Sequence, residues 1–196
     1  MNTRTIAAFD FDGTFITKDS FILFFRKNRV IFNFYKVFIK HLPDLIAMKL
    51  NKRANDLVKE KVLTSFLNGF SKDEFEKLCN SFSPEIEAHL NQEAFNKFKW
   101  HREQGHSVVI ISASPENWII PWANKLGIEV ISTKLDVVNN KLTGKLASPN
   151  CYGQEKVNRL LNRFPNRGSY ELYAYGDSSG DKELLELADH AFYKSF

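Results

Sequence analysis

The chain has few of the residues that mark small secreted proteins, flexible linkers or extended fibres. Its 196 residues include two cysteines, nine glycines and six prolines. Cys79 and Cys151 lie far apart and in no metal-binding spacing, so we expect free thiols in a reducing compartment. The glycines and prolines gather into no linker, and we find no repeat. The length therefore fits one domain, or one domain with a sizeable insertion.

Long hydrophobic runs are also missing. The first apolar run ends at Asp10, which is too early for a secretory signal. The most apolar stretch is interrupted by Arg26, Lys27 and Arg29, which argues against a membrane-spanning helix. We therefore expect a cytoplasmic protein.

Positive charge is concentrated in one segment. The net charge is +4, yet residues 21–53 alone carry +7. The charged residues of this segment are Arg26, Lys27, Arg29, Lys36, Lys40, Lys49, Lys52 and Arg53, against Asp44. Its aromatic and aliphatic residues recur at helical spacing, from Phe21 to Leu42. Two interpretations stay open: a helical subdomain with an aromatic core, or an element that lies on an anionic membrane surface at the inner face. No nucleic-acid-binding module accompanies the charge, so we expect no nucleic acid partner.

Two carboxylates end the first apolar run. Ile6 to Phe9 is typical of a short buried strand, and Asp10 and Asp12 follow it directly. Residues two apart on extended backbone point to the same side, so both carboxylates can face one small volume. Gly13 allows a sharp turn, and Thr14 offers a hydroxyl group. Because close carboxylates repel each other, the pair predicts a divalent cation, with Mg²⁺ as the first candidate.

Strands and helices are expected to alternate along the rest of the chain. We expect helices over about 20–81, broken at Pro43 and near Gly69, and one helical stretch over about 83–103. Pro115 is expected to open a helix that Pro121 kinks or splits. The expected later strands are 107–112, 129–132, a hairpin of 135–138 with 141–144, 172–177 and 191–193. This alternation predicts an α/β fold with a parallel sheet.

Reactive groups follow several of these strands or begin helices. Ser112 ends one strand, Lys156 lies at the start of a helix, and Asp177 and Asp181 follow another strand. In a parallel sheet the carboxyl ends of the strands meet at one edge, so these groups are expected to lie near Asp10.

The ordered set resembles the motifs of the haloacid dehalogenase-like phosphatases. The matching elements are Asp10-x-Asp12-Gly13-Thr14, Ser112, Lys156 and Gly176-Asp177-x-x-x-Asp181, which span nearly the whole chain. The resemblance is to the subfamily that includes phosphoserine phosphatases. It implies a Rossmann-like core of residues 1–18 and 100–196, and a helical cap of residues 19–99 inserted after the first strand.

The resemblance also implies a role for each residue. Asp10 would attack phosphorus and form an aspartyl-phosphate, and Asp12 would act as general acid and base. Mg²⁺ would be held by Asp10, Asp177 and the backbone carbonyl of Asp12. The substrate phosphate would be bound by Gly13, Thr14, Ser112, Ala113 and Lys156. Asp181 would orient Lys156 or a water molecule.

The expected substrate is less defined. Asp19 and Gly180 stand where phosphoserine phosphatases carry a glutamate and an asparagine. The segments Ser112–Glu116 and Gly176–Asp181, with the basic aromatic insertion, look more like a bacterial branch that includes phosphatidylglycerophosphate phosphatases. A lipid-headgroup phosphate is therefore expected, with a small soluble phosphomonoester or a phosphotransfer reaction as alternatives. A non-catalytic peripheral membrane protein is the alternative from another class, and the oligomeric state stays open.

Overall fold

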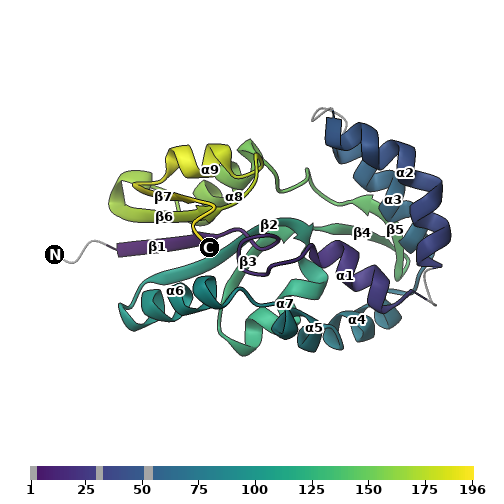
Figure 1. Ribbon diagram of the computed structural model, residues 1–196, viewed down its shortest axis with the longest axis horizontal. Helices are drawn as coiled ribbons and strands as arrows, with labels where there is room; N and C mark the ends of the chain where they lie inside the picture. The colour runs from purple at the N-terminus through teal and green to yellow at the C-terminus, as the bar shows by residue number, and fades with distance from the viewer. Residues whose placement is uncertain (1–3, 30–32, 51–54) are drawn as a thin grey trace.

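A five-stranded parallel sheet forms the centre of the molecule (Figure 1). The computed structural model describes residues 4–29, 33–50 and 55–196. In the order β3-β2-β1-β6-β7, the strands are Glu129–Thr133, Ser107–Pro115, Arg4–Phe9, Tyr170–Gly176 and His190–Tyr193. Every neighbouring pair is parallel. The predicted α/β fold with a parallel sheet is confirmed.

Helices cover both faces of this sheet, because successive apolar side chains of β1 point to opposite faces. Ile6 and Ala8 pack in one cluster with side chains of α8 (Gln154–Arg163) and α9 (Lys182–Leu187). Ala7 and Phe9 pack in the other cluster, with side chains of α6 (Gln92–Glu103) and α7 (Glu116–Lys125). The sheet therefore has a buried apolar layer on each side, and Figure 1 shows α8 and α9 on the face opposite α6.

The segment inserted after β1 divides into two groups of helices (Figure 1). α1 (Ser20–Lys27), α4 (Lys72–Asn80) and α5 (Ser83–Ala88) lie along the α7 side of the molecule. α2 (Phe34–Leu50) and α3 (Asn55–Leu67) pack on each other at one end. An aromatic contact joins the two groups, since the ring centroids of Phe25 in α1 and Phe66 in α3 are 4.0 Å apart. Another joins α1 to α7, since the ring centroids of Phe24 and Trp118 are 4.8 Å apart. Many aromatic side chains of the insertion therefore belong to the hydrophobic core.

The predicted hairpin is present, and it packs on α3. Its strands β4 (Leu135–Val138) and β5 (Lys141–Leu146) are antiparallel. The backbone N–H of Gly69 donates to the carbonyl of Leu142 at 2.8 Å, and Leu142 donates back to Phe70 at 2.9 Å. The hairpin thus lies against the helices of the insertion, although it follows them by many residues in sequence. The division into a core and a cap stays a prediction.

Three predicted helix boundaries are wrong. α2 runs through Pro43, where a break was expected; the carbonyl of Ile39 that loses its partner lies on an exposed part of the helix, where water can replace the donor. The stretch 83–103 is two helices, because Asn91 caps α6 and its N–H donates to the carbonyl of Phe15 at 3.0 Å. α7 begins at Glu116, after Pro115, and it is not split at Pro121.

Part of the basic aromatic segment lies outside the described residues, namely Val30, Ile31, Phe32, Lys52 and Arg53. Among the helices that the structure describes, none combines the length and the hydropathy needed to cross a bilayer.

Candidate active site

The turn after β1 places its carboxylates against the end of β6. The N–H of Asp10 donates to the carbonyl of Tyr175 at 2.8 Å, which fixes the two strand ends side by side. Gly13 has a φ of +79°, and a Cβ atom there would lie 2.4 Å from Oδ2 of Asp177. Only a residue without a side chain allows this close approach.

Three carboxylates converge at this edge of the sheet. Oxygen atoms of Asp10, Asp177 and Asp181 all lie within 4.8 Å of one another. The hydroxyl group of Thr14 donates to Oδ1 of Asp177 at 3.3 Å, and the side chain of Thr14 is buried. The structure therefore brings together the acidic groups that the sequence placed at separate strand ends.

Lys156 lies between two of these carboxylates. Its Nζ atom is 2.6 Å from Oδ1 of Asp10 and 2.5 Å from Oδ1 of Asp181, and the residue is only 2% exposed. The other oxygen of Asp181 accepts from the N–H of Ser178 at 3.0 Å and from its hydroxyl at 2.8 Å. Asp181 therefore fixes the position of the lysine ammonium group next to Asp10.

The electrostatics of the cluster favour an added cation. Burial raises the pKa of Asp10 to about 7, although Lys156 acts in the opposite direction. Burial, followed by the charge of Asp181, also raises the pKa of Asp177. For Lys156 burial opposes the charged form, but Asp10 and Asp181 outweigh it and the pKa is raised. One lysine thus faces three carboxylates, and an all-oxygen set of this kind suits Mg²⁺.

Asp12 is held by a separate network. Its Oδ1 atom accepts from the N–H of Ser20 at 2.6 Å, and its Oδ2 atom accepts from the hydroxyl of Ser114 at 2.6 Å. The Ser20 hydroxyl donates to Ser114 at 3.1 Å and accepts from the indole N–H of Trp118 at 3.1 Å. The Asp12 carboxylate is therefore oriented by Ser20 of α1 and by Ser114 at the end of β2, apart from the other three carboxylates.

The last residues of β2, from Ser112 onward, complete the polar part of the site. The hydroxyl of Ser112 accepts from the N–H of Ser114 at 3.0 Å, and Ser112 is buried. Lys59 of α3 donates to the carbonyl of Ala113 at 2.5 Å and to the side-chain oxygen of Asn150 at 2.8 Å. Lys59 and Asn150 were missed at the sequence level, because neither belongs to a strand end or a motif. Ser114 was noted only as part of its segment.

These groups line a cavity of about 390 Å³. Its polar lining includes Asp10, Asp12, Asp19, Lys59, Ser112, Ala113, Ser114, Asn150, Lys156, Asp177 and Ser178. Its apolar wall comes from the inserted helices, with Phe21, Ile22, Phe34, Phe38 and Val62. Gly13 and Thr14 lie next to Asp177 and are not among the residues that line the cavity.

Two similar proteins cover nearly the whole chain. Protein CicA of Caulobacter vibrioides is 33% identical over 200 residues, which is 97% of this chain and 86% of CicA. A probable phosphatase of Mycobacterium tuberculosis is 29% identical over 202 residues, which is 96% of this chain and 68% of that protein.

Solved structures share the fold at lower identity. A Bordetella pertussis protein of unknown function matches with a TM-score of 0.77 and 22% identity, over 94% of this chain and 87% of that one. A phosphoserine phosphatase with an analogue of the phospho-aspartyl intermediate matches with a TM-score of 0.62 and 18% identity, over 95% of this chain and 84% of that one.

The family model of the haloacid dehalogenase-like hydrolases matches residues 7–186. This range contains the acidic turn, the Ser112 loop, Lys156 and both aspartates that follow β6. The chain therefore belongs to the haloacid dehalogenase-like hydrolase family.

Proposed function

We propose that the chain is a Mg²⁺-dependent phosphomonoester hydrolase that works through a phosphorylated Asp10. One observation carries the proposal: Asp10 lines the cavity with its carboxylate 2.6 Å from a buried lysine, within 4.8 Å of Asp177 and Asp181. This supplies a nucleophile, a positive charge and a cation site at a single point. The probable phosphatase of M. tuberculosis and the phosphoserine phosphatase of the same fold support this choice of substrate bond.

The first step uses Asp10 as the nucleophile. A carboxylate oxygen of Asp10 forms a bond to phosphorus while the ester P–O bond breaks, and the leaving alkoxide takes a proton from Asp12. In the second step Asp12 takes a proton from water, the water oxygen bonds to phosphorus, and the bond between phosphorus and Asp10 breaks. Inorganic phosphate and free Asp10 result.

The remaining residues neutralise or position the charges around the phosphoryl group. Lys156 offsets the negative charge that Asp10 and the phosphoryl group share, and Asp181 keeps the ammonium group in position. Ser112 and Ala113 bind phosphate oxygens, with Gly13 and Thr14 supporting the site from the turn. Asp10, Asp177 and the backbone carbonyl of Asp12 would hold Mg²⁺, which would neutralise charge on the phosphoryl oxygens.

We further propose a lipid-headgroup phosphate as substrate and an anionic membrane surface as its source. The apolar wall from Phe21 to Val62 faces the polar floor across the cavity, which suits a phosphate attached to an apolar group. A small soluble phosphate ester would leave this wall in contact with water.

The test compares Asp10→Asn with an exposed control, Asp73→Asn of α4. With para-nitrophenyl phosphate, Asp10→Asn is expected to lose activity by about a thousandfold or more, because it removes the nucleophile. Asp73→Asn is expected to keep the wild-type rate. Removing Mg²⁺ with a chelator should abolish turnover, and adding it back should restore it. Full turnover by a correctly folded Asp10→Asn protein would show that the phosphoenzyme mechanism is wrong.

A panel of phosphate esters tests the substrate class. The lipid proposal predicts a higher kcat/KM for a glycerophospholipid phosphate monoester than for phosphoserine. The opposite order would favour the small soluble ester and leave the hydrolysis mechanism unchanged.

A further inference from the structure

The outer side of α2 carries a row of large apolar side chains that face solvent. Tyr35, Ile39, Leu42 and Ile46 are between 42% and 69% exposed. They follow one another at intervals of four, three and four residues, the spacing that places side chains on one face of a helix. We call these four residues the α2 stripe. Single exposed apolar residues are ordinary, but a continuous row of them on one helix indicates a contact surface.

The α2 stripe lies beside the cavity. On the same helix Phe34 and Phe38 line the cavity, and Phe34 and His41 are buried against the rest of the molecule. Around the helix axis, Phe38 comes between these buried positions and the stripe. A flat surface in contact with the stripe would therefore lie next to the apolar wall of the cavity.

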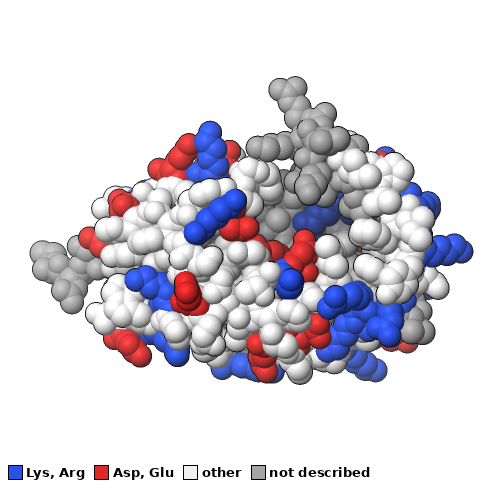
Figure 2. All heavy atoms as spheres, in the orientation of Figure 1, with Lys and Arg blue, Asp and Glu red and all other residues white. Residues whose placement is uncertain are grey.

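Positive charge borders the stripe on its other side. Lys36 and Lys40 are exposed, and the described residues provide no ion pair for either. In Figure 2 the surface over α2 is largely uncharged, with lysine and arginine side chains at its margin. The segment 21–53, which contains α2, carries a net charge of +7. An apolar row edged by lysines is the pattern of a helix that lies in the interface of an anionic bilayer.

We propose that the α2 stripe docks the protein on an anionic bilayer, with the four apolar side chains at the headgroup level and Lys36 and Lys40 on lipid phosphates. A second copy of the chain and a nucleic acid each fit this surface less well than a bilayer does. Two copies packed symmetrically through this face would bring their own lysines together. A nucleic acid would match the lysines but leave the apolar row without a partner.

Docking in this way brings the apolar wall of the cavity to the membrane surface. This consequence rests on the proposed function, since it presents the site to a phosphate at the headgroup level. The docking itself does not depend on catalysis, and the two can be measured separately.

The binding test uses vesicles of phosphatidylcholine with and without phosphatidylserine. Phosphatidylserine is chosen because its phosphate is a diester, so binding at the active site does not confuse the result. Wild-type protein is expected to sediment with the anionic vesicles and to be released by salt. Ile39→Ser and Tyr35→Ser should each weaken binding by about fivefold or more, since each removes apolar area from the interface.

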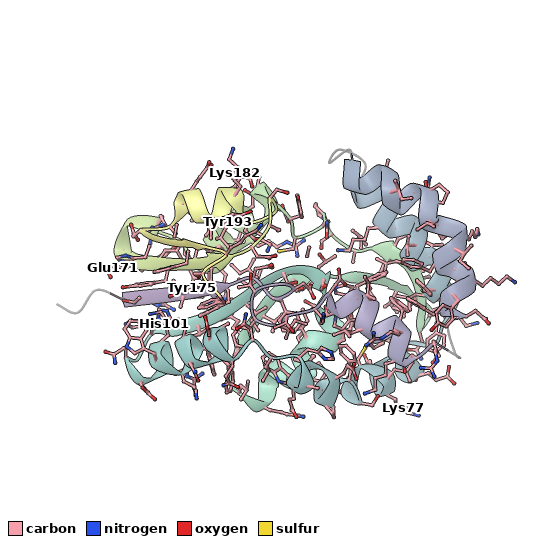
Figure 3. The ribbon with its side chains drawn as sticks, in the orientation of Figure 1. Lys77, His101, Glu171, Tyr175, Lys182 and Tyr193 are labelled. Carbon is pink, nitrogen blue, oxygen red and sulfur yellow. The ribbon has the colours of Figure 1, made fainter. Side chains whose placement is uncertain are left out.

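Matched controls lie away from α2. Tyr193 is 57% exposed, close to the 63% of Tyr35, so Tyr193→Ser should leave vesicle binding unchanged (Figure 3). Lys36→Gln with Lys40→Gln should weaken binding by about twentyfold or more, at roughly fivefold for each lysine. Lys77→Gln with Lys182→Gln removes the same charge away from α2 and should have little effect (Figure 3).

The outcomes separate docking from catalysis. All variants keep their core, so each should hydrolyse para-nitrophenyl phosphate at the wild-type rate and melt near the wild-type temperature. Equal vesicle binding by wild type and all three α2 variants would overturn the docking proposal while leaving the hydrolase proposal intact. Loss of a dimer in the Ile39→Ser variant, with vesicle binding unchanged, would assign the stripe to a second copy of the chain and also overturn it.

Discussion

At the scale of single residues, Lys156 holds together a group of charges that could not be buried without it. It touches Asp10 and Asp181 at 2.6 and 2.5 Å, and all three residues are buried. Replacing one member of a buried ion pair leaves the other charge without compensation. The lysine is therefore expected to stabilise the folded protein as well as the phosphoryl group.

This predicts a large loss of stability in Lys156→Met. Without Mg²⁺ at neutral pH, its free energy of unfolding should fall by about 3–5 kcal/mol, and added Mg²⁺ should restore part of the loss. The control is Lys182→Met, since Lys182 and Glu186 form an exposed pair at 3.7 Å worth about 1 kcal/mol at most. Urea unfolding of the two variants, with and without Mg²⁺, makes the measurement. Equal stability of the two would contradict a structural role for the buried lysine.

Gly13 gives a second prediction, with a control of the same backbone conformation. Gly13 and Gly69 both have a φ of +79°, but only at Gly13 would a Cβ atom meet another group, at 2.4 Å from Asp177. Gly13→Ala and Gly69→Ala should each lose about 1–2 kcal/mol from backbone strain. Only Gly13→Ala should also lose Mg²⁺ affinity, by about tenfold to a hundredfold, because Asp177 must move. Calorimetric titration with Mg²⁺ distinguishes them, and an equal affinity in both would refute the coupling.

The sequence predicted the site residues whose positions are determined by the parallel sheet. Asp10 and Asp177 follow parallel strands, so their approach needed no knowledge of side-chain contacts. Lys59 and Asn150 are different, because they meet through side chains from α3 and from a loop 91 positions away in the chain. Neither the hydrophobic periodicity nor the motif spacing of the sequence indicates such a contact. The missed part of the site is therefore the part that depends on a side-chain contact between α3 and this loop.

At the scale of elements, the hairpin and α3 are joined by a close backbone contact. A Cβ atom at Gly144 of β5 would lie 2.2 Å from the Cα atom of Thr64 in α3. Backbone cannot rotate away as a side chain can, so the hairpin must shift to accommodate any larger residue. Since α3 also carries Lys59 and Val62 into the cavity, such a shift reaches the site.

Gly144→Ala is therefore expected to loosen the hairpin. Gly105→Ala is its control, because Gly105 has a similar φ of +74° and open space around it. Beyond the strain that both share, Gly144→Ala should lose about a further 1–3 kcal/mol of stability from overpacking. Hydrogen exchange should quicken at the amides of Gly69 and Leu142, which bond across this contact. Unchanged protection of those two amides would argue against the close contact.

The elements that were wrongly predicted share a physical cause. The local sequence predicted a helix break at Pro43 and a continuous helix through residue 90. In the folded protein, the environment of each segment gives the opposite result. Pro43 is tolerated because Ile39, whose carbonyl loses its partner, lies on an exposed part of the helix. The helix is interrupted where Leu90 pairs with Ile16 and Asn91 with Phe15, next to the acidic turn. Tertiary contacts of this kind outweigh helix propensity.

At the scale of the whole molecule, one buried histidine ties the helical layer to the sheet. His101 of α6 is fully buried, and its Nε2 atom lies 2.9 Å from the hydroxyl of Tyr175 in β6 (Figure 3). Its Nδ1 atom lies 2.8 Å from Nδ1 of His106. Burial, then the nearby charges of His106 and Lys97, lowers the pKa of His101 to about 3. The neutral imidazole is therefore part of the packed interior.

This lowered pKa predicts that the protein loses stability in mild acid. The unfolded chain protonates His101 near its ordinary pKa of about 6.5, whereas the folded protein resists protonation until about 3. Between these values the unfolded state binds more protons, so stability falls as the pH falls. From pH 7 to about 5 the loss from this residue is about 2 kcal/mol. His101→Gln, which keeps a polar side chain but cannot titrate, should lack this part of the pH dependence.

Urea unfolding at both pH values measures the difference. His190→Gln serves as control, because the side chain of His190 is 42% exposed and lies at the sheet edge. His190→Gln should keep the wild-type slope of stability against pH, and His101→Gln should show a shallower one. If His101→Gln instead lost stability in acid as steeply as wild type, the acid sensitivity would not come from His101. Asp10 cannot supply it, because its raised pKa favours the folded state as the pH falls towards 4.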